Sequence, residues 1–253
     1  MTPSSTAIAK RLVHLGRAAL DIFIPPTCPV TGELVSEPNV LSGSGWSQIN
    51  FITDPTCARC GLPFALDYGA GVICAACIAS PRPFDRARSA IRFDDVSRPL
   101  INRFKHNDRI DLAPLFAKWM VGVGRDLMGS DTIMTPVPLH HRRLFSRRYN
   151  QAAVLAEKSA LLFPCVYEPN LITRIRATPP QQDQSSVEAR ERNVSGAFAV
   201  IGDNQRRVRD RDFVLVDDVM TTGATLSACA RALKMAGARK VDVLVLAGVF
   251  AGR

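Results

Sequence analysis

The sequence lacks a long uninterrupted apolar segment. Its best candidate for a membrane or export segment, residues 8–24, is interrupted by His14, Arg17 and Asp21, and no small-residue cleavage site follows it. A membrane-spanning helix needs about 20 consecutive apolar residues, and a secretory signal ends in a cleavage site. We therefore expect an amphipathic helix over residues 1–27 of a cytoplasmic protein, with no membrane insertion.

The sequence also lacks two common nucleotide-binding motifs. It contains no G-x-x-x-x-G-K-[ST] phosphate loop and no dinucleotide fingerprint after a first strand. Aromatic residues make up 7% of the chain, and because most of them are needed for a core, few are left to stack on nucleic-acid bases. Acidic residues are outnumbered by basic ones, 23 to 32, and the basic residues are mainly arginines. The net charge of +9 suits phosphate-rich ligands, whether small molecules or nucleic acid.

The composition divides the chain into three regions. The amino-terminal helix is followed by residues 28–83, which are rich in Pro, Gly, Ser and Cys and have weak apolar periodicity. From residue 84 to residue 253, short β-rich runs alternate with helical patterns, which is typical of βαβ units and a parallel sheet. We predict an α/β fold preceded by a small domain, and we find no internal repeat.

Four of the seven cysteines form two Cys-x-x-Cys pairs, Cys57 with Cys60 and Cys74 with Cys77. Two such pairs can close on one tetrahedral zinc ion, and bound zinc can supply the folding energy that a small, loop-rich segment lacks. The alternative is four unrelated buried cysteines. We predict a zinc-ribbon domain over residues 28–83, with a structural ion that is closed by four thiolates and has no catalytic role.

The other three cysteines are expected to bind no metal. Cys28 begins a similar turn, but Thr31 stands where a second thiolate is needed, so we predict no second metal site. Cys165 and Cys229 stand alone in apolar surroundings and are expected to be core thiols.

The most informative segment begins at residue 213. Residues 213–216 form an apolar run without charges, which is typical of a central parallel strand. An acidic pair follows, then a loop of hydroxyl residues and glycine, then a helical pattern over residues 224–236. The pair and the loop contain Asp217, Asp218, Thr221, Thr222, Gly223, Ala224 and Thr225. In parallel sheets, ligands bind at this end of the strands.

These residue types suit a sugar phosphate. Backbone N–H groups at a helix start attract phosphate, Gly223 permits close approach, and the threonine hydroxyls add donors. The carboxylates can accept hydrogen bonds from vicinal ribose hydroxyls, directly or through Mg²⁺. Two alternatives stay open: solvated acids at a strand end with threonine helix caps, or a phospho-acceptor aspartate pocket, which needs no threonine-glycine loop.

Residues 214–225 resemble the phosphoribosyl diphosphate (PRPP) binding motif of type I phosphoribosyltransferases. With further segments in the same order, nearly the whole chain after Cys28 is similar to the ComF family, the competence-protein-F and GntX group. These segments are residues 57–77, 84–88, 104–105, 136–139, 147–151 and 178–198. The resemblance implies a type I phosphoribosyltransferase-like parallel sheet, flanked by helices, over residues 84–253.

The resemblance also implies roles for individual residues. It puts Asp217 and Asp218 on the ribose hydroxyls and the residues from 221 to 225 around the 5-phosphate. A loop after residues 132–137 and a closing loop over residues 178–193 belong to the pyrophosphate side, where arginine forks pair well with phosphate oxygens. The candidates there are Lys105, Arg142, Arg143, Arg147, Asn150, Gln151, Arg190 and Arg192. The alternatives are solvated surface charges and a plain connecting loop.

Two functional classes stay open. An enzyme would bind PRPP with Mg²⁺, release pyrophosphate and transfer the phosphoribosyl group, but no segment identifies the acceptor. A binding module would handle single-stranded DNA for the DNA-uptake machinery, with PRPP as a regulatory ligand, since the family is linked to natural transformation and to the use of DNA as a nutrient. The candidates for DNA contact are the basic segments 82–109, 142–148 and 206–211, with Phe104, Phe145 and Tyr149 for stacking.

Overall fold

The computed structural model describes residues 25–106, 109–139, 149–176 and 192–250. The chain divides into two compact units, residues 1–48 and residues 49–253, and each is described by itself. The predicted helix over residues 1–27 lies almost wholly outside the described residues. The domain boundaries at residues 28 and 84 stay predictions, and both Cys-x-x-Cys pairs lie in the larger unit.

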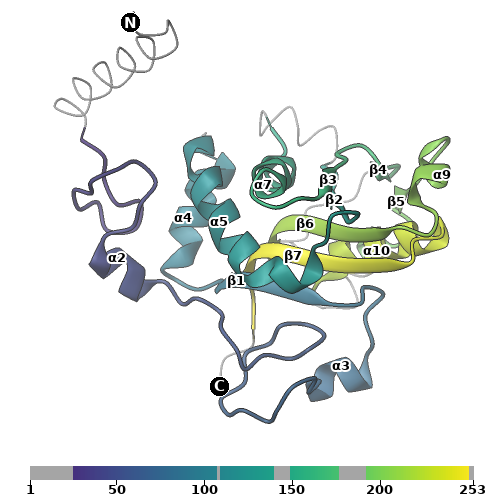
Figure 1. Cartoon of the computed structure of the whole chain (residues 1–253), viewed down its shortest axis with the longest axis horizontal. Coiled ribbons are helices and arrows are strands. Elements are labelled where there is room, and N and C mark those ends of the chain that lie inside the picture. Colours follow the sequence, from purple (N-terminus) through teal and green to yellow (C-terminus); the bar gives the residue numbers. More distant parts are fainter. Residues whose placement is uncertain (1–24, 107–108, 140–148, 177–191, 251–253) are drawn as a thin grey trace, which may run out of the picture. The chain divides into compact units, whose positions relative to one another are not determined.

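The larger unit is built on a five-stranded parallel sheet (Figure 1). Its strand order is β1-β7-β6-β2-β3, and all neighbours are parallel. The strands are β1 (Ala87–Arg92), β2 (Ile133–Pro136), β3 (Val166–Tyr167), β6 (Asp212–Met220) and β7 (Lys240–Gly248). A separate antiparallel pair joins β4 (Thr173–Arg174) and β5 (Phe198–Ala199). The predicted α/β fold with a parallel sheet is confirmed.

Helices cover both faces of this sheet. The helices α5 (Ala113–Gly124) and α7 (Gln151–Ala160) pack on one face, as Figure 1 shows. Along β7, Leu244 contacts Gly124 of α5, whereas its neighbours Val243 and Val245 lie in the core beneath α10 (Ala224–Met235). Because side chains alternate between the faces of a strand, α10 covers the opposite face.

The remaining described elements are short. They are α2 (Gly43–Gln48) in the smaller unit, and α3 (Ala75–Ala79), α4 (Ser97–His106), α9 (Asn204–Val208) and the 3-10 turns η1 (Ile110–Leu112) and η2 (Arg125–Leu127) in the larger one. None of the helices in the described ranges has the length and apolar character needed to cross a membrane.

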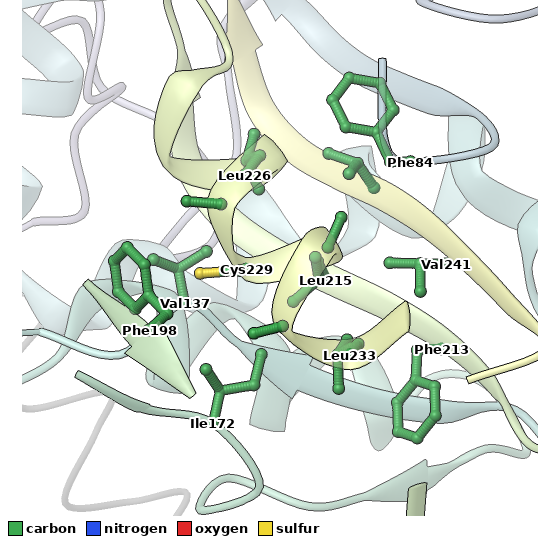
Figure 2. Packing of buried hydrophobic residues seen from close by; sticks show 14 of the residues in the cluster. Phe84, Val137, Ile172, Phe198, Phe213, Leu215, Leu226, Cys229, Leu233 and Val241 are labelled. Carbon is green, nitrogen blue, oxygen red and sulfur yellow. The ribbon is translucent and has the colours of Figure 1, made fainter. Parts of the chain in front are cut away.

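The main apolar core lies between α10 and the sheet. Figure 2 shows Leu226, Cys229 and Leu233 of α10 beside Phe213 and Leu215 of β6. All five side chains are at most 1% exposed. Full burial of a leucine or phenylalanine side chain contributes about 1.5–3 kcal/mol. This layer therefore fixes α10, and with it the loop that precedes α10, on the sheet.

The two isolated cysteines differ in burial. Cys229 is a core thiol as predicted, and burial raises its pKa well above the usual range. Cys165 is only partly buried, so the prediction of a core thiol is wrong at this position. It lies just before the edge strand β3, next to side chains such as Leu162 and Val166 that are themselves exposed.

Strand β6 is longer than the apolar run predicted. Its ladder with β7 continues through Asp217, which pairs with Val245, to Met220, which pairs with Gly248. Backbone groups make a ladder, and side chains point out of the sheet plane, so two carboxylates do not end it. The acidic pair therefore belongs to the strand itself.

The chain contains one cysteine motif twice, which corrects the prediction of no internal repeat. The first copy spans residues 27–48 and ends in α2, and the second spans residues 56–79 and ends in α3. Each copy opens with an isolated antiparallel bridge, Thr27 with Leu34 in the first and Thr56 with Pro63 in the second.

The cysteine turns of the two copies share their hydrogen bonds. The N–H of the first cysteine, Cys28 or Cys57, donates to the carbonyl five residues later, at 2.7 and 2.8 Å. The N–H of the glycine four residues later, Gly32 or Gly61, donates back to the cysteine carbonyl at 2.9 Å in both copies. Both glycines have a positive φ, 76° and 70°, which glycine adopts without strain.

Candidate functional site

The acidic pair of β6 is divided between the two faces of the sheet. Phe213 and Leu215 lie in the core beneath α10, and alternation along the strand puts Asp217 on the same side. Burial raises the pKa of Cys229 in α10, and the charge of Asp217 adds to this effect. Asp218 points to the other side, where its Oδ1 lies 3.1 Å from Nζ of Lys105. The N–H of Asp218 donates to Oδ1 of Asp217 at 2.9 Å. Asp218 is 9% exposed, and its carboxylate is paired with Lys105.

The loop after β6 has a backbone suited to an anion. Gly223 has a φ of 74° and caps the start of α10, whose first N–H groups have no partner within the helix. Thr221 is exposed, whereas Thr222 and Thr225 are half-buried. The N–H of Ala224 donates to Oγ1 of Thr222 at 3.4 Å. The helix begins at Ala224 as predicted, so its positive dipole end lies at this loop.

Arg82 reaches this loop from the segment before β1. Its guanidinium donates to the carbonyl of Thr222, and Nη1 would lie 2.9 Å from a Cβ placed on Gly223. The carbonyl of Arg82 in turn accepts from Nη2 of Arg59 at 3.0 Å. The sequence placed Arg82 only in the basic segment 82–109 proposed for DNA contact. Its contact with the phosphate loop was not predicted, because it joins positions 140 residues apart.

The segment 149–151 holds the end of α4 beside the acidic pair. The hydroxyl of Tyr149 donates to the carbonyl of Phe104, and the side-chain amide of Gln151 donates to the carbonyl of Lys105 at 3.0 Å. These bonds fix the backbone that carries Lys105 toward Asp218. Tyr149 was predicted only for stacking, and its role as a support for α4 was missed.

Asn150 joins α7 to the loop after β2. Its Oδ1 accepts from the N–H of Ala153 as the amino-terminal cap of α7, and its Nδ2 donates to the carbonyl of Val137 at 3.1 Å. The N–H of Val137 donates to the carbonyl of Val216 in β6 at 2.9 Å. The loop predicted for the pyrophosphate side therefore starts beside the carboxyl end of β6. A direct contact of Asn150 or Gln151 with phosphate stays a prediction.

The other predicted residues are located as follows. Arg192 is exposed, while Arg142, Arg143, Arg147, Arg190 and Phe145 lie outside the described residues. Phe104 is 0% exposed and packs edge-on against Phe116, with ring centroids 5.3 Å apart. The prediction that Phe104 stacks on nucleic-acid bases is therefore wrong, because the core needs this ring.

The four thiols of the second cysteine motif form a compact cluster. Their Sγ atoms all lie within 4.8 Å of one another, and those of Cys60 and Cys74 are 3.7 Å apart. Tetrahedral zinc with bonds of about 2.3 Å places its sulfurs about 3.8 Å apart, so the spacing fits. Burial raises the pKa of Cys77 to about 11, and a dication would hold all four groups as thiolates. The cluster fits a structural zinc site.

At the four positions that correspond to the zinc ligands, the first cysteine motif has a single thiol, that of Cys28. Thr31, Ser42 and Gly45 stand where the second motif has its last three cysteines. The hydroxyls of Thr31 and Ser42 are 3.0 Å apart, and the N–H of Gly45 donates to Oγ of Ser42 at 3.1 Å. Sγ of Cys28 would lie 2.5 Å from a Cβ on Gly45, so the thiol fills the space of the missing side chain. In the described part of the chain, the only candidate metal cluster is that of the second motif.

Comparison with known proteins matches both parts of the chain. A family model of the double zinc ribbon domain matches residues 19–78, and one of the phosphoribosyl transferase domain matches residues 151–253. The double ribbon agrees with the two cysteine motifs, although the first motif lacks three of the four thiols that a zinc site requires.

Three relatives extend this similarity. The DNA utilization protein YhgH of Escherichia coli (strain K12) is 30% identical over 200 residues, which cover 77% of this chain and 85% of the relative. Competence protein F of Haemophilus influenzae is 28% identical over 198 residues, covering 76% of this chain and 84% of the relative. A ribose-phosphate pyrophosphokinase of Haemophilus ducreyi is 37% identical over 105 residues, covering 39% of this chain and 32% of the relative.

Proposed function

Because the chain belongs to the ComF and YhgH family of proteins with a phosphoribosyltransferase-type domain and a zinc ribbon, we propose that it binds PRPP with Mg²⁺ and acts in the uptake or use of external DNA. The relatives named for DNA utilization and for competence support the role in DNA metabolism. The domain match supports the PRPP site. The proposed place of action is the cytoplasm, where a zinc-thiolate ribbon stays reduced.

The proposal for PRPP rests on the position of the acidic pair directly before the loop that starts α10. Asp217 and Asp218 lie at the carboxyl end of the central strand, and Gly223 starts the helix that follows directly. A 5-phosphate at this loop would accept hydrogen bonds from backbone N–H groups. The ribose hydroxyls, a few ångströms away, would donate to the carboxylates. Sugar and phosphate are then recognised together.

The carboxylates also suit the divalent ion that accompanies a diphosphate. Carboxylate oxygens are ligands that Mg²⁺ prefers, so Asp217 and Asp218 are the residues that would hold it, directly or through water. The ion would neutralise the diphosphate charge. Asp218 forms an ion pair with Lys105 in this structure. The side chains of Lys105 and Asp218 are 18% and 13% exposed, so a ligand from solvent can compete for either partner.

Titration calorimetry with PRPP and Mg²⁺ tests this site. We expect the zinc-replete protein to bind, and the double variant Asp217→Asn/Asp218→Asn to lose binding. The matched control is Asp210→Asn, an exposed acid near the amino end of β6 whose φ of 58° asparagine tolerates. Absence of binding by the unaltered protein would overturn the proposal.

Transfer of the phosphoribosyl group is the enzymatic form of this proposal. The bond between the anomeric carbon and the diphosphate oxygen would break, a nucleophile would bond to that carbon, and pyrophosphate would leave. The protein would contribute positioning and electrostatic stabilisation. Release of pyrophosphate in the presence of candidate acceptors, and its loss in the double variant, is the corresponding assay.

A single-stranded DNA-binding module with PRPP as regulator is the second candidate. Exposed arginines around the end of α9 favour it, namely Arg206, Arg207, Arg209 and Arg211. Each DNA phosphate that a variant no longer neutralises should lower the slope of log affinity against log salt by about 0.7 for a single strand. We expect Arg206→Ala/Arg209→Ala/Arg211→Ala to flatten this slope. Arg125→Ala, at an exposed position of η2 outside the basic segments, should leave the slope unchanged. Equal slopes would remove this surface from the proposal.

A further inference from the structure

We propose that Arg82 is a positioning residue of the phosphate loop and that it makes phosphate binding depend on the zinc ribbon. The inference rests on the proposed function of the loop between β6 and α10. It adds a residue and a coupling that the PRPP motif does not contain, since Arg82 belongs to the segment between α3 and β1.

The second cysteine turn is attached to the first strand of the sheet. The N–H of Ala87 donates to the carbonyl of Arg59 at 2.6 Å, and Nη1 of Arg88 donates to the carbonyl of Ala58 at 3.3 Å. Gly61 lies so close that a Cβ there would be 2.8 Å from the carbonyl oxygen of Ala87. Metal ligation shapes this turn, so the metal also fixes the position of the Arg59 backbone against β1.

Two guanidinium groups lead from this turn to the phosphate loop. Arg59 donates to the carbonyl of Arg82 at 3.0 Å, which holds the backbone of the segment between α3 and β1. Arg82 then donates from its own guanidinium to the carbonyl of Thr222. Hydrogen bonds from charged donors are about twice as strong as neutral ones, so this short chain of contacts can transmit a change in the ribbon to the loop.

The contact at Thr222 sets the direction of a donor in the loop. The carbonyl of Thr222 and the N–H of Gly223 belong to one planar trans peptide and point in opposite directions. With the carbonyl held by Arg82, the N–H of Gly223 points to the opposite side of the loop, where a bound phosphate would accept it. The positive charge on the carbonyl also polarises the peptide and strengthens its N–H as a donor. The lack of a side chain at Gly223 leaves room for the guanidinium.

The test compares variants by their affinity for ribose 5-phosphate, a monophosphate probe, and for PRPP with Mg²⁺. We expect Arg82→Ala to weaken both affinities on the order of tenfold, within the usual range of coupling between sites. Arg82→Lys, which keeps a cationic donor, should recover part of the loss. The matched control is Arg88→Ala, which removes another guanidinium contact between ribbon and sheet but does not touch the loop.

The shift of the Gly223 amide signal on ligand binding distinguishes a positioning role of Arg82 from a general loss of stability. In nitrogen-proton correlation spectra, ribose 5-phosphate should shift this signal in the unaltered protein and in Arg88→Ala, but much less in Arg82→Ala. Because coupling between binding affinities is reciprocal, ribose 5-phosphate should also raise the zinc affinity of the unaltered protein, measured by equilibrium competition with a chelator, and should not do so in Arg82→Ala. Arg59→Ala leaves the loop itself intact and should show the same reduced Gly223 shift as Arg82→Ala. This variant tests the coupling if Arg82→Ala does not fold.

The outcomes separate this inference from the proposed function. If the unaltered protein binds both ligands and Arg82→Ala binds them equally well with the same Gly223 shift, Arg82 has no positioning role and the PRPP site stands. If the unaltered protein binds neither ligand, the proposed function fails and this inference fails with it.

Discussion

At the scale of single residues, Gly223 has two constraints that no other residue type meets. Its φ of 74° is costly for a residue with a Cβ, and a Cβ would also lie 2.9 Å from Nη1 of Arg82. We predict that Gly223→Ala lowers the free energy of unfolding by about 1–3 kcal/mol and weakens ribose 5-phosphate binding, as measured by urea unfolding and calorimetry.

Gly202 provides the matched control for this substitution. Its φ of 60° imposes a similar backbone cost, but a Cβ there would meet nothing within 4 Å. Gly202→Ala should therefore show the backbone cost alone and leave ligand binding unchanged. Equal effects of the two substitutions on ligand binding would contradict the importance of the Arg82 contact.

Asp242 is the most buried acid in the described ion pairs. Its side chain is 1% exposed and lies 2.7 Å from Nη2 of Arg86 and 2.9 Å from Nζ of Lys240. Removing Asp242 loses charge-assisted hydrogen bonds but leaves two cations that solvent still reaches, with side chains 28% and 36% exposed, which costs about 1.5–3 kcal/mol. We predict this loss for Asp242→Ala in urea unfolding, compared with less than about 1 kcal/mol for Asp126→Ala, whose side chain is 46% exposed. A small effect of Asp242→Ala would show that water reaches the pair.

The residues of the candidate site were predictable where they are neighbours in sequence. Asp217, Asp218 and Gly223 stand in one strand-loop-helix segment, so their order alone indicates an anion site. Arg82 and Tyr149 were not predictable as supports of this site. Each donates to a backbone carbonyl of a distant segment. Every residue has such a carbonyl, so the residue types do not indicate which one is the partner.

At the scale of elements, the two cysteine motifs show how one backbone persists with and without metal ligands. The shared features are a cysteine, a glycine at positive φ and a short helix. Thr31, Ser42 and Gly45 stand at three ligand positions in the first motif, so the cysteines of this sequence alone do not reveal the repeat. Its turn is instead held by backbone hydrogen bonds and by the contact of the Thr31 and Ser42 hydroxyls.

We predict one zinc ion per chain. Cys60→Ser should abolish stoichiometric zinc and destabilise the second motif, because the site needs four ligands. Cys28→Ser should leave the zinc content unchanged. Metal analysis of the purified variants distinguishes these outcomes, and two zinc ions in the unaltered protein would contradict the assignment of the first motif as metal-free.

The thiol of Cys28 provides a pH-dependent prediction for the first motif. Burial tends to raise the pKa of Cys28, but hydrogen bonds from Ser42 and Thr31 outweigh it and lower the pKa to about 6. Since an unfolded thiol has a pKa of about 8.5, the thiolate contributes stability that is complete above that pH. This contribution is lost as the pH falls through about 6.

The measurement is the pH titration of the Cys28 carbon-13 β signal. We expect a midpoint near the lowered pKa in the unaltered protein and a higher one in Ser42→Ala, because this substitution removes a donor to the sulfur. A midpoint in the ordinary thiol range in both proteins would show that the hydroxyls do not stabilise the thiolate.

At the scale of the whole molecule, alternating β and helical patterns were sufficient to predict a parallel sheet. The strand order β1-β7-β6-β2-β3 was not predictable from these patterns, because an apolar run does not specify its partner strand and pairing depends on how the connections pack. Strand β6 holds the central position, and Phe213 to Val216 are fully buried in it, but Val241 to Ala247 of β7 are buried as well, so burial identifies inner strands and not the central one. The central position of β6 brings Val137, Asp218 and the α10 loop to one edge of the sheet.

A crystal structure of the zinc-replete protein with PRPP and Mg²⁺ tests the central claim most directly. The account predicts the 5-phosphate at the backbone N–H groups of residues 222–225 and the ribose hydroxyls facing Asp217 and Asp218. A 5-phosphate bound elsewhere, or a loop between β6 and α10 that stays empty at saturating ligand, would contradict it.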